Sequence, residues 1–410
     1  MTIFLRITVL VFLTAACMGP ASDKKQPDDS LQYYPPTPAV MDKETFREYY
    51  RRISAFFDST LLKGPFSGQI LLAKEGTVLY EKYAGFKDVR KKDSMDAATS
   101  LHIASASKTF TGIAILRLVQ EGKLQLDDSI SRYFPLLPYK GITVKMLLNH
   151  RSGLPNYVHF MDKTGWDTKQ YCSNQDVLDI LIKQRPNPEA APGRKFSYCN
   201  TNYILLALLI EQLSGQSYPV YMQEKLFGPL QMKDTYVFTR ADSSRATPSF
   251  GPSGNFWQFD FLDLTYGDKN IYSTARDLLR WDQALYSGQL LSPALLDAAF
   301  TPYSFERPSM HNYGLGFRLM QLPNGKKIIY HFGRWHGNNA CFARLPDEKA
   351  VIIILGNRFN RGIYYAAHRA YDLFGDYFQS AASEEESDSL PAEKKEKESP
   401  AKKTTQKKAR

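Results

Sequence analysis

Ser105 and Lys108 form a Ser-x-x-Lys pattern, the first combination in this sequence that could do covalent chemistry. They open an apolar run with helical spacing, and residues three apart share one face of a helix, so the amine would lie beside the hydroxyl. A serine becomes a good nucleophile only when a neighbouring base takes its proton. Burial and the positive end of the helix dipole would both favour the neutral amine, which can act as that base. The same helix start offers backbone N–H groups to a developing oxyanion.

The pattern alone is weak evidence, because it also occurs at Ser22/Lys25 and at Ser399/Lys402. Both of these copies lie in polar, Pro- or Lys-rich segments where neither a helix nor a pocket is expected to position the pair. Its position at the start of a helix therefore singles out Ser105 and Lys108.

Tyr198 and Asn200 form a second candidate group, on a loop between Pro192-Gly193 and an apolar helix that Gly215 should end. Two side chains spaced in this way can point into one cavity and supply a proton shuttle and a hydrogen-bond donor. The alternative is a turn tyrosine followed by an asparagine that caps the next helix. Cys199 between them is expected to pack.

His331 and Gly333 follow a short apolar strand and form a third candidate group. A glycine there would let a substrate or another backbone approach closely. The histidine is expected to face the cleft, with an ordinary edge-strand histidine as the alternative.

Taken in order, Ser105-x-x-Lys108, Tyr198-x-Asn200 and His331-x-Gly333 resemble the motifs of serine β-lactamases and penicillin-binding proteins, in particular the class C β-lactamase and D,D-peptidase type. Four further segments resemble that family as well: residues 147–155, 192–215, 271–278 and 313–317. A literal Lys163-Thr164-Gly165 is rejected as the third motif, because it precedes the tyrosine motif and lies among loop segments instead of on a strand edge.

The resemblance implies a two-step acyl transfer. Ser105 would attack a carbonyl carbon, with Lys108 and Tyr198 sharing the general-base and general-acid work. The backbone N–H groups of Ser105 and Arg334 would form the oxyanion hole, and water would then release the acyl group.

The substrate itself would be held by Asn200, His331 and Gly333 according to the same resemblance. Asn200 would bind an amide or an equivalent polar group, and His331 would line the leaving-group or carboxylate side. No cofactor and no metal is implied.

Departures from the family pattern leave the substrate open. His331 stands where many penicillin-recognising enzymes have lysine, and Arg334 stands where a small residue is usual, so it could restore the positive charge or crowd the cleft. The aromatic residues that could form an apolar acyl pocket, or equally belong to the core, are Trp166, Trp257, Phe332 and Trp335. We therefore expect an esterase or D,D-peptidase-like hydrolase, with β-lactam hydrolysis possible and a noncatalytic envelope binding protein as the alternative.

The elements that must position these residues indicate an α+β fold, an antiparallel sheet flanked by helices with an inserted mainly helical domain. Asp42 should cap a helix, and strands 68–73 and 77–84 should form a hairpin. Strands return at 327–332, 340–345 and 350–355, before a last helix at 363–378. The globular domain is expected at 42–380, with its helical insertion at about 105–270.

Composition and the two ends of the chain indicate the compartment. The chain has 410 residues and a formal net charge of +10, with the basic residues interleaved with acids, which does not favour nucleic acid as a partner. Residues 1–17 are typical of a signal peptide with a possible lipobox, which would make Cys17 a lipidation site; plain secretion or an uncleaved anchor are the alternatives. Residues 18–41 should form a tether and 381–410 a disordered charged tail. We expect an exported, lipid-anchored envelope protein whose partner is a small or cell-wall-derived ester or amide.

Overall fold

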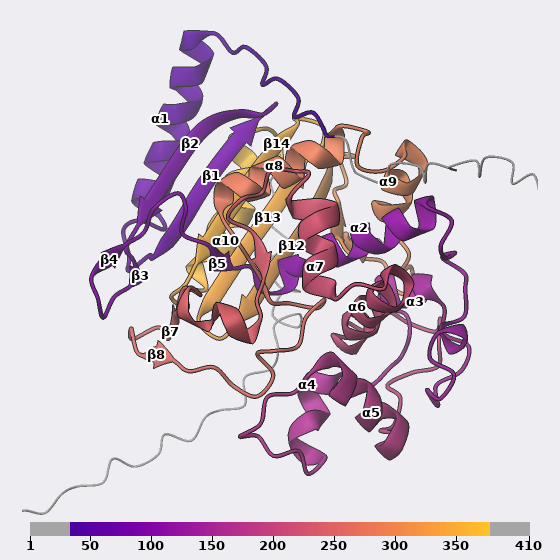
Figure 1. Ribbon diagram of the computed structural model, residues 1–410. Coiled ribbons are helices and arrows are strands. Elements are labelled where there is room, and N and C mark those ends of the chain that lie inside the picture. Colours follow the sequence, from indigo (N-terminus) through magenta and orange to yellow (C-terminus); the bar gives the residue numbers. More distant parts are fainter. Residues whose placement is uncertain (1–32, 378–410) are drawn as a thin grey trace, which may run out of the picture. The chain divides into compact units, whose positions relative to one another are not determined.

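The computed structural model describes residues 33–377, which are built around a seven-stranded antiparallel sheet (Figure 1). Its strands follow the order β10 (His311–Tyr313), β11 (Arg318–Gln321), β12 (Lys327–Trp335), β13 (Asn338–Leu345), β14 (Ala350–Gly356), β1 (Gly68–Lys74) and β2 (Thr77–Ala84). The sheet thus joins the two ends of the domain, because β1 pairs with β14 along its whole length.

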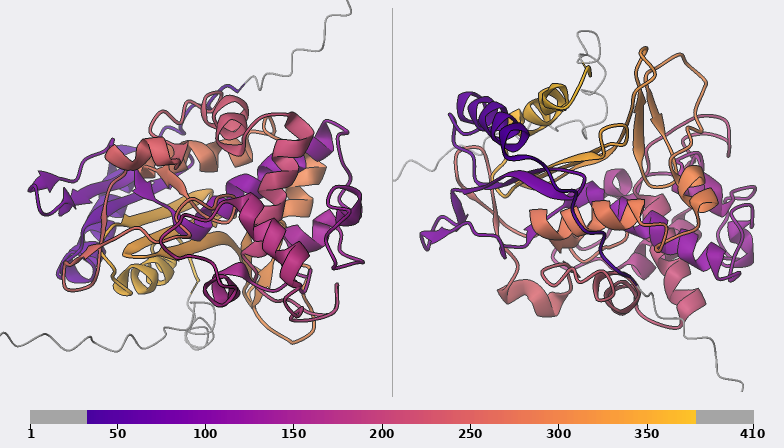
Figure 2. Two further views of the ribbon diagram at one scale, coloured as in Figure 1. Left: turned by 60° about the horizontal axis from the view of Figure 1, so that its bottom comes forward. Right: turned by 90° about the horizontal axis from the view of Figure 1, so that it is seen from above.

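Helices cover both faces of the sheet, as Figure 2 shows. Helices α1 (Lys43–Ser59) and α10 (Gly362–Ala370) pack on one face, and α2 (Ser107–Gln120) and α8 (Ala275–Tyr286) lie on the other. Strands β13 and β14 are buried at every residue, as expected for strands covered on both sides. Helix α1 begins at Lys43 because the Asp42 carboxylate accepts hydrogen bonds from two backbone N–H groups of its first turn.

A mainly helical region lies in the chain between β2 and β10. Its centre is α6 (Thr201–Ser214), which is apolar on nearly all sides and packs against α2 and its helical neighbours. Gly215 ends α6 with a φ of 70°, a conformation that glycine adopts without strain. The other helices of this region are α3 (Val144–Leu148), α4 (Tyr157–Phe160), α5 (Asn174–Gln184), α7 (Tyr218–Met222) and α9 (Pro293–Ala299).

Short strands form a separate three-stranded sheet. Strand β9 (Ile271–Ser273) lies between β5 (Leu101–His102) and β6 (Tyr236–Val237). Two small antiparallel pairs complete the fold: β3 (Phe86–Asp88) with β4 (Asp93–Ser94), and β7 (Ser249–Phe250) with β8 (Phe256–Trp257).

The predicted fold class is confirmed, and the differences lie at element ends. Strand β12 continues to Trp335 because its hairpin with β13 turns only at His336 and Gly337. The last helix stops at Ala370, where a 3₁₀ turn takes over and the Asp372 side chain accepts the backbone N–H of Tyr377.

The predicted tether is too long at its C-terminal end. Tyr33 is buried in the core, and the backbone of Tyr34 exchanges hydrogen bonds with the Gln289 side chain. Ala39 binds Glu75 and Thr77 at the β1–β2 hairpin. Residues 34–40 are exposed, but Tyr33, Tyr34 and Ala39 attach this stretch to the domain, so the expected domain start at 42 is placed too late.

Some predictions concern segments outside the described residues: the signal peptide with Cys17, the tether up to residue 32, the end of the last helix at 378 and the charged tail. Within residues 33–377, no helix combines the length and the apolar character needed to cross a membrane.

Candidate active site

Ser105 and Lys108 meet where the helical region joins the sheet. Ser105 lies in a 3₁₀ turn, Ala104–Ala106, that leads directly into α2. The Lys108 Nζ lies 3.1 Å from the Ser105 Oγ and donates a second hydrogen bond of 2.7 Å to the backbone carbonyl of Asp268. Lys108 is completely buried, whereas Ser105 is partly exposed. The amine is thus fixed beside an accessible hydroxyl.

The Tyr198 loop lies on the other side of the lysine. The Tyr198 ring is 5.1 Å from the Lys108 Nζ and is partly exposed. The loop is held through its backbone, because the N–H of Cys199 donates to the His150 Nδ1 at 3.1 Å and the N–H of Asn200 donates to the Asn156 side chain at 3.2 Å.

This arrangement leaves the two polar side chains of the loop available. The Asn200 side chain does not cap α6, so the capping alternative is not what the structure shows. Among residues 33–377, neither the Tyr198 hydroxyl nor the Asn200 amide group forms a hydrogen bond with another side chain or the backbone. Cys199 is buried, with its Sγ close to the carbonyl of Leu154, as a packing residue would be.

Strand β12 brings Gly333 against the nucleophile turn. A Cβ at position 333 would lie 2.6 Å from both the Ser105 nitrogen and the Ile103 oxygen, so only glycine allows this approach. The pairing of β11 with β12 ends at Tyr330, and no described strand pairs with residues 331–335 on that side. The backbone of Arg334 therefore lies on an open strand edge next to Ser105.

His331 is placed differently from the expectation. It lies on the same face of β12 as Gly333 but is completely buried, with its Nδ1 donating to the Phe332 carbonyl at 2.8 Å and its Nε2 accepting from the Tyr313 hydroxyl at 3.0 Å. Burial and the nearby charges of Arg318 and Lys108 hold its pKa well below the usual 6.5. His331 is therefore a neutral, buried residue beneath the site. The expectation that its side chain faces the cleft and contacts substrate is wrong for this structure.

The Arg334 side chain and the Phe332 ring both lie on the opposite face of β12. The Arg334 guanidinium stacks over Phe359 at 4.5 Å, and Phe332 packs with Tyr364 in the apolar layer between the sheet and helices α1 and α10. Successive residues of a strand point to opposite faces, so neither side chain restores a charge in the cleft or crowds it.

The tryptophans divide between pocket and core. Trp257 and Trp335 line a small pocket of about 20 Å³ next to the nucleophile turn, together with His102 and His336. Trp166 packs against the core and donates its N–H to the Gln170 carbonyl. An aromatic pocket thus lies beyond Arg334 along the strand.

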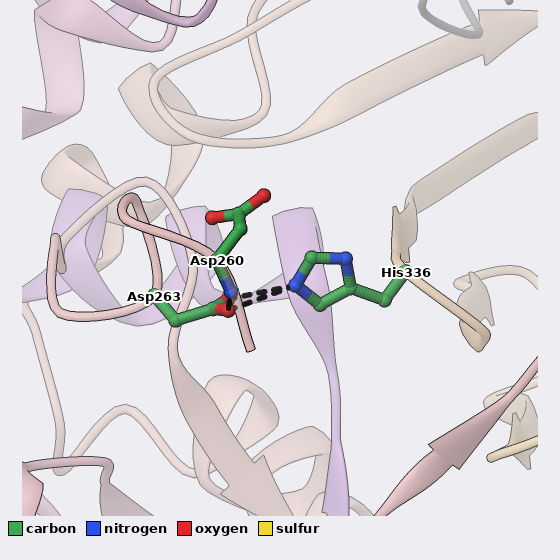
Figure 3. A group of neighbouring side chains, drawn as sticks. All are labelled: Asp260, Asp263 and His336. Carbon is green, nitrogen blue, oxygen red and sulfur yellow. Dashed lines mark hydrogen bonds and ion pairs between the residues drawn. The ribbon is translucent and has the colours of Figure 1, made fainter. Parts of the chain in front are cut away.

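Three neighbouring side chains at this pocket, Asp260, Asp263 and His336, have potential metal-ligand atoms within 4.8 Å of one another. Figure 3 shows that the His336 ring points at Asp263 and that the Asp260 carboxylate is directed away from this pair. The Asp263 carboxylate accepts from the His336 Nε2 at 2.9 Å and from the Trp335 N–H at 2.5 Å. Burial would raise the pKa of Asp263, but these hydrogen bonds hold it below its usual value. Asp263 and His336 therefore form a hydrogen-bonded pair, and we assign no metal to the three residues.

Three residues near the motifs were missed by the sequence reasoning. The His150 ring lies tilted against Tyr198 with 4.3 Å between ring centroids, and His150 belongs to the segment 147–155 that resembles the family. The Arg318 guanidinium lies 5.1 Å over the Tyr198 ring, directly after segment 313–317. Asp268 anchors Lys108 through its carbonyl oxygen, for which no side-chain pattern could give a signal.

Together, the mixed fold and the Ser-Lys-Tyr arrangement define a serine acyl hydrolase of the β-lactamase and penicillin-binding protein class. Residues 64–375 match the family model "Beta-lactamase", and the chain belongs to that family.

Individual relatives agree with this assignment. The chain is 31% identical to penicillin-binding protein 4* of Bacillus subtilis (strain 168) over 75% of its own length and 72% of the relative. It is 38% identical to protein Flp of Staphylococcus aureus (strain MW2), again over 75% of its own length but only 63% of the relative. The crystal structure of D-amino acid amidase from Ochrobactrum anthropi SV3 shares the fold with a TM-score of 0.67 at 24% identity, covering 80% of this chain and 98% of the amidase.

Proposed function

We propose that this chain is an exported hydrolase that cleaves an ester or amide through an acyl-enzyme intermediate on Ser105. The observation that carries the proposal is the Lys108 amine, buried and held 3.1 Å from the Ser105 hydroxyl by the Asp268 carbonyl. A buried amine with one hydrogen bond to the nucleophile and one to a carbonyl is well placed to take a proton from the nucleophile.

The reaction follows from the positions of the groups. As the Ser105 Oγ attacks the carbonyl carbon, its proton passes to Lys108, and the N–H groups of Ser105 and Arg334 stabilise the oxyanion. Among the described residues, the Ser105 N–H donates no backbone hydrogen bond and is available for this role. Tyr198 delivers a proton to the leaving group and regains one from Lys108. Water then attacks the acyl carbonyl carbon as Lys108 takes its proton, and Lys108 returns that proton to Ser105 as the acid leaves.

The charges near Tyr198 favour a substrate with a carboxylate on its leaving group. Arg318 provides a permanent positive charge 5.1 Å from the Tyr198 ring, which a neutral, covered His331 does not. Asn200 would bind the acyl-side amide, and the exposed edges of Trp257 and Trp335 would lie beside the acyl group. A D,D-peptide derived from the cell wall has this chemistry, and the names of penicillin-binding protein 4* and D-amino acid amidase point to the same class.

The experiment is a hydrolysis assay with three probes: p-nitrophenyl acetate, an N-acyl-D-alanyl-D-alanine peptide and D-phenylalanine amide. We expect turnover of at least one probe, its loss in Ser105→Ala, and wild-type rates in the control Ser253→Ala, which changes an exposed loop serine. Binding of the peptide without any turnover or acylation would favour the second candidate, a noncatalytic envelope binding protein.

The location of the protein belongs to the same proposal. Residues 1–17 would direct export and Cys17 would carry a lipid, with no nucleic acid among the partners. A full-length chain should partition into detergent after expression in a bacterium, and a Cys17→Ser variant should not. Equal partitioning of the two chains would contradict lipid attachment at Cys17.

A further inference from the structure

The backbone just before Ser105 is held in a strained conformation. Ala104 has a φ of 48°, in the left-handed region that costs a non-glycine residue about 1 kcal/mol or more. Such a conformation persists only when the surroundings hold it, and here the Ala104 N–H donates to the Nδ1 of His102 at 3.0 Å. His102 therefore acts on the peptide that leads into the nucleophile.

His102 has only one protonation state that fits its contacts. Its Nδ1 must accept, because the Ala104 N–H can only donate. The proton then lies on Nε2, which donates to the Asn270 Oδ1 at 2.9 Å. The side chain is 3% exposed and has its ring edge-on to Tyr272 on β9.

The chain of hydrogen bonds continues to the far side of the site. The Asn270 amide N–H donates to the backbone carbonyl of Asp263 at 2.5 Å. The Asp263 carboxylate in turn accepts from Trp335, the last residue of β12, and from His336 in the turn that follows; Figure 3 shows the Asp263–His336 pair. One end of this series of hydrogen bonds thus lies next to the Ser105 N–H, and its other end lies next to the Arg334 N–H.

We propose that the hydrogen-bonded chain His102–Asn270–Asp263 positions the two halves of the oxyanion hole relative to each other, with His102 as its key positioning residue. This inference rests on the proposed function, which supplies the oxyanion hole. His102 touches neither substrate nor reacting atoms and acts through Ala104. Since oxyanion stabilisation depends on donors within about 0.5 Å of their place, a small shift of the turn is costly.

Protonation of His102 would break the hydrogen bond between the Ala104 N–H and the Nδ1 of His102, because the second ring proton would then face the Ala104 N–H. Burial lowers the pKa of His102 to about 4, opposed by its hydrogen bond to Asn270 and by the charge of Asp263 and assisted by His336 and Lys269. The acylation rate should therefore show an acid limb near this pH that disappears when position 102 cannot titrate.

The test compares His102→Leu, which removes the acceptor, with His102→Asn, whose Oδ1 can still accept the Ala104 N–H. The readouts are the rate at which p-nitrophenyl acetate acylates Ser105, the affinity of a boronic acid that forms a tetrahedral adduct there, and KM. We expect acylation to slow about 10- to 100-fold in His102→Leu and boronate affinity to fall in parallel, with KM little changed. His102→Asn should recover most of both.

His159→Leu is the matched control, since His159 is exposed on α4. Acylation of folded His102→Leu at the wild-type rate would overturn the inference. If that variant does not fold, the pH dependence of the acylation rate is measured in His102→Asn instead. An acid limb identical to that of the wild type would then overturn the inference. A wild-type chain that no probe acylates would instead count against the proposed function.

Discussion

Gly333 and Ser105 approach each other so closely that a side chain of any size at position 333 would collide with the nucleophile turn. A Cβ there would lie 2.6 Å from the Ser105 nitrogen, well inside normal contact distance. The sheet and the helical region thus meet backbone to backbone at the point where we place the oxyanion hole. Four predictions concern this junction and the groups around it.

Gly333→Ala should inactivate the enzyme more than it destabilises the fold. The added methyl must push β12 away from the turn, which we expect to slow acylation by at least about 100-fold and to cost about 1–3 kcal/mol in the free energy of unfolding. Acylation kinetics and urea denaturation measure the two effects. Gly64→Ala is the control, because its Cβ would meet its nearest atom at 4.0 Å. Equal acylation by Gly333→Ala and wild type would mean that the junction is not part of the site.

Lys108→Met should lose about 10²- to 10⁴-fold in the acylation rate, because methionine fills the buried space of the lysine stem but cannot take the serine proton. The matched control is Lys163→Met. This residue belongs to the Lys163-Thr164-Gly165 sequence, lies in a 3₁₀ turn and is exposed. A loss of activity in Lys163→Met with retention in Lys108→Met would reverse our choice between the two motifs.

Tyr198→Phe should discriminate between leaving groups. Phenylalanine keeps the stacking with His150 and Arg318 and removes only the hydroxyl. An amine leaving group needs a proton, whereas nitrophenolate does not, so we expect amide hydrolysis to fall by about 10²-fold or more and nitrophenyl ester hydrolysis to fall much less. Tyr171→Phe, at an exposed tyrosine, is the control. Equal losses on both substrates would show that Tyr198 is not the proton donor.

The stability of the fold should fall in mild acid. Burial holds the pKa of His331 and of His150 well below 6.5, and that of His102 at about 4. Below pH 6.5 the unfolded chain takes up protons at these positions while the folded chain does not, so the free energy of unfolding decreases as the pH falls. Above pH 7 both states carry neutral histidines, and these groups contribute no pH dependence.

The size of this loss of stability follows from how far the folded-state pKa of each histidine lies below its unfolded value. Each histidine contributes up to about 1.4 kcal/mol per pH unit, and His102 alone roughly 3 kcal/mol in total. Urea denaturation between pH 5 and pH 7.5 measures the slope, which should be smaller in His331→Asn and unchanged in His159→Asn, where the histidine is exposed. The same slope in His331→Asn and wild type would contradict a neutral His331.

The parts of the site that follow from local spacing were predictable. Ser105 and Lys108 are three residues apart at a helix start, so their contact follows from helix geometry. Strand alternation also places Gly333 and Trp335 on one face and Arg334 on the other, which is enough to direct the Arg334 side chain away from the cleft.

Contacts between distant segments were not predictable in this way. His102 and Asn270 are 168 residues apart, and nothing in either local pattern signals their hydrogen bond. Strand alternation gives the face on which His331 lies but not that Tyr313 covers it. Similarly, the Pro-rich composition of residues 33–41 indicates a tether, yet Tyr33 finds a buried site on the domain.

The central claim is that Ser105 is a nucleophile activated by Lys108. Intact mass spectrometry after exposure to a fluorophosphonate, and separately to a penicillin, tests it most directly in the wild type and in Ser105→Ala. We predict one fluorophosphonate adduct on the wild type and none on Ser105→Ala, and a penicillin adduct at the same residue if the substrate is a D,D-peptide. A folded wild-type chain that forms no adduct with either reagent, or an adduct that persists in Ser105→Ala, would contradict the account.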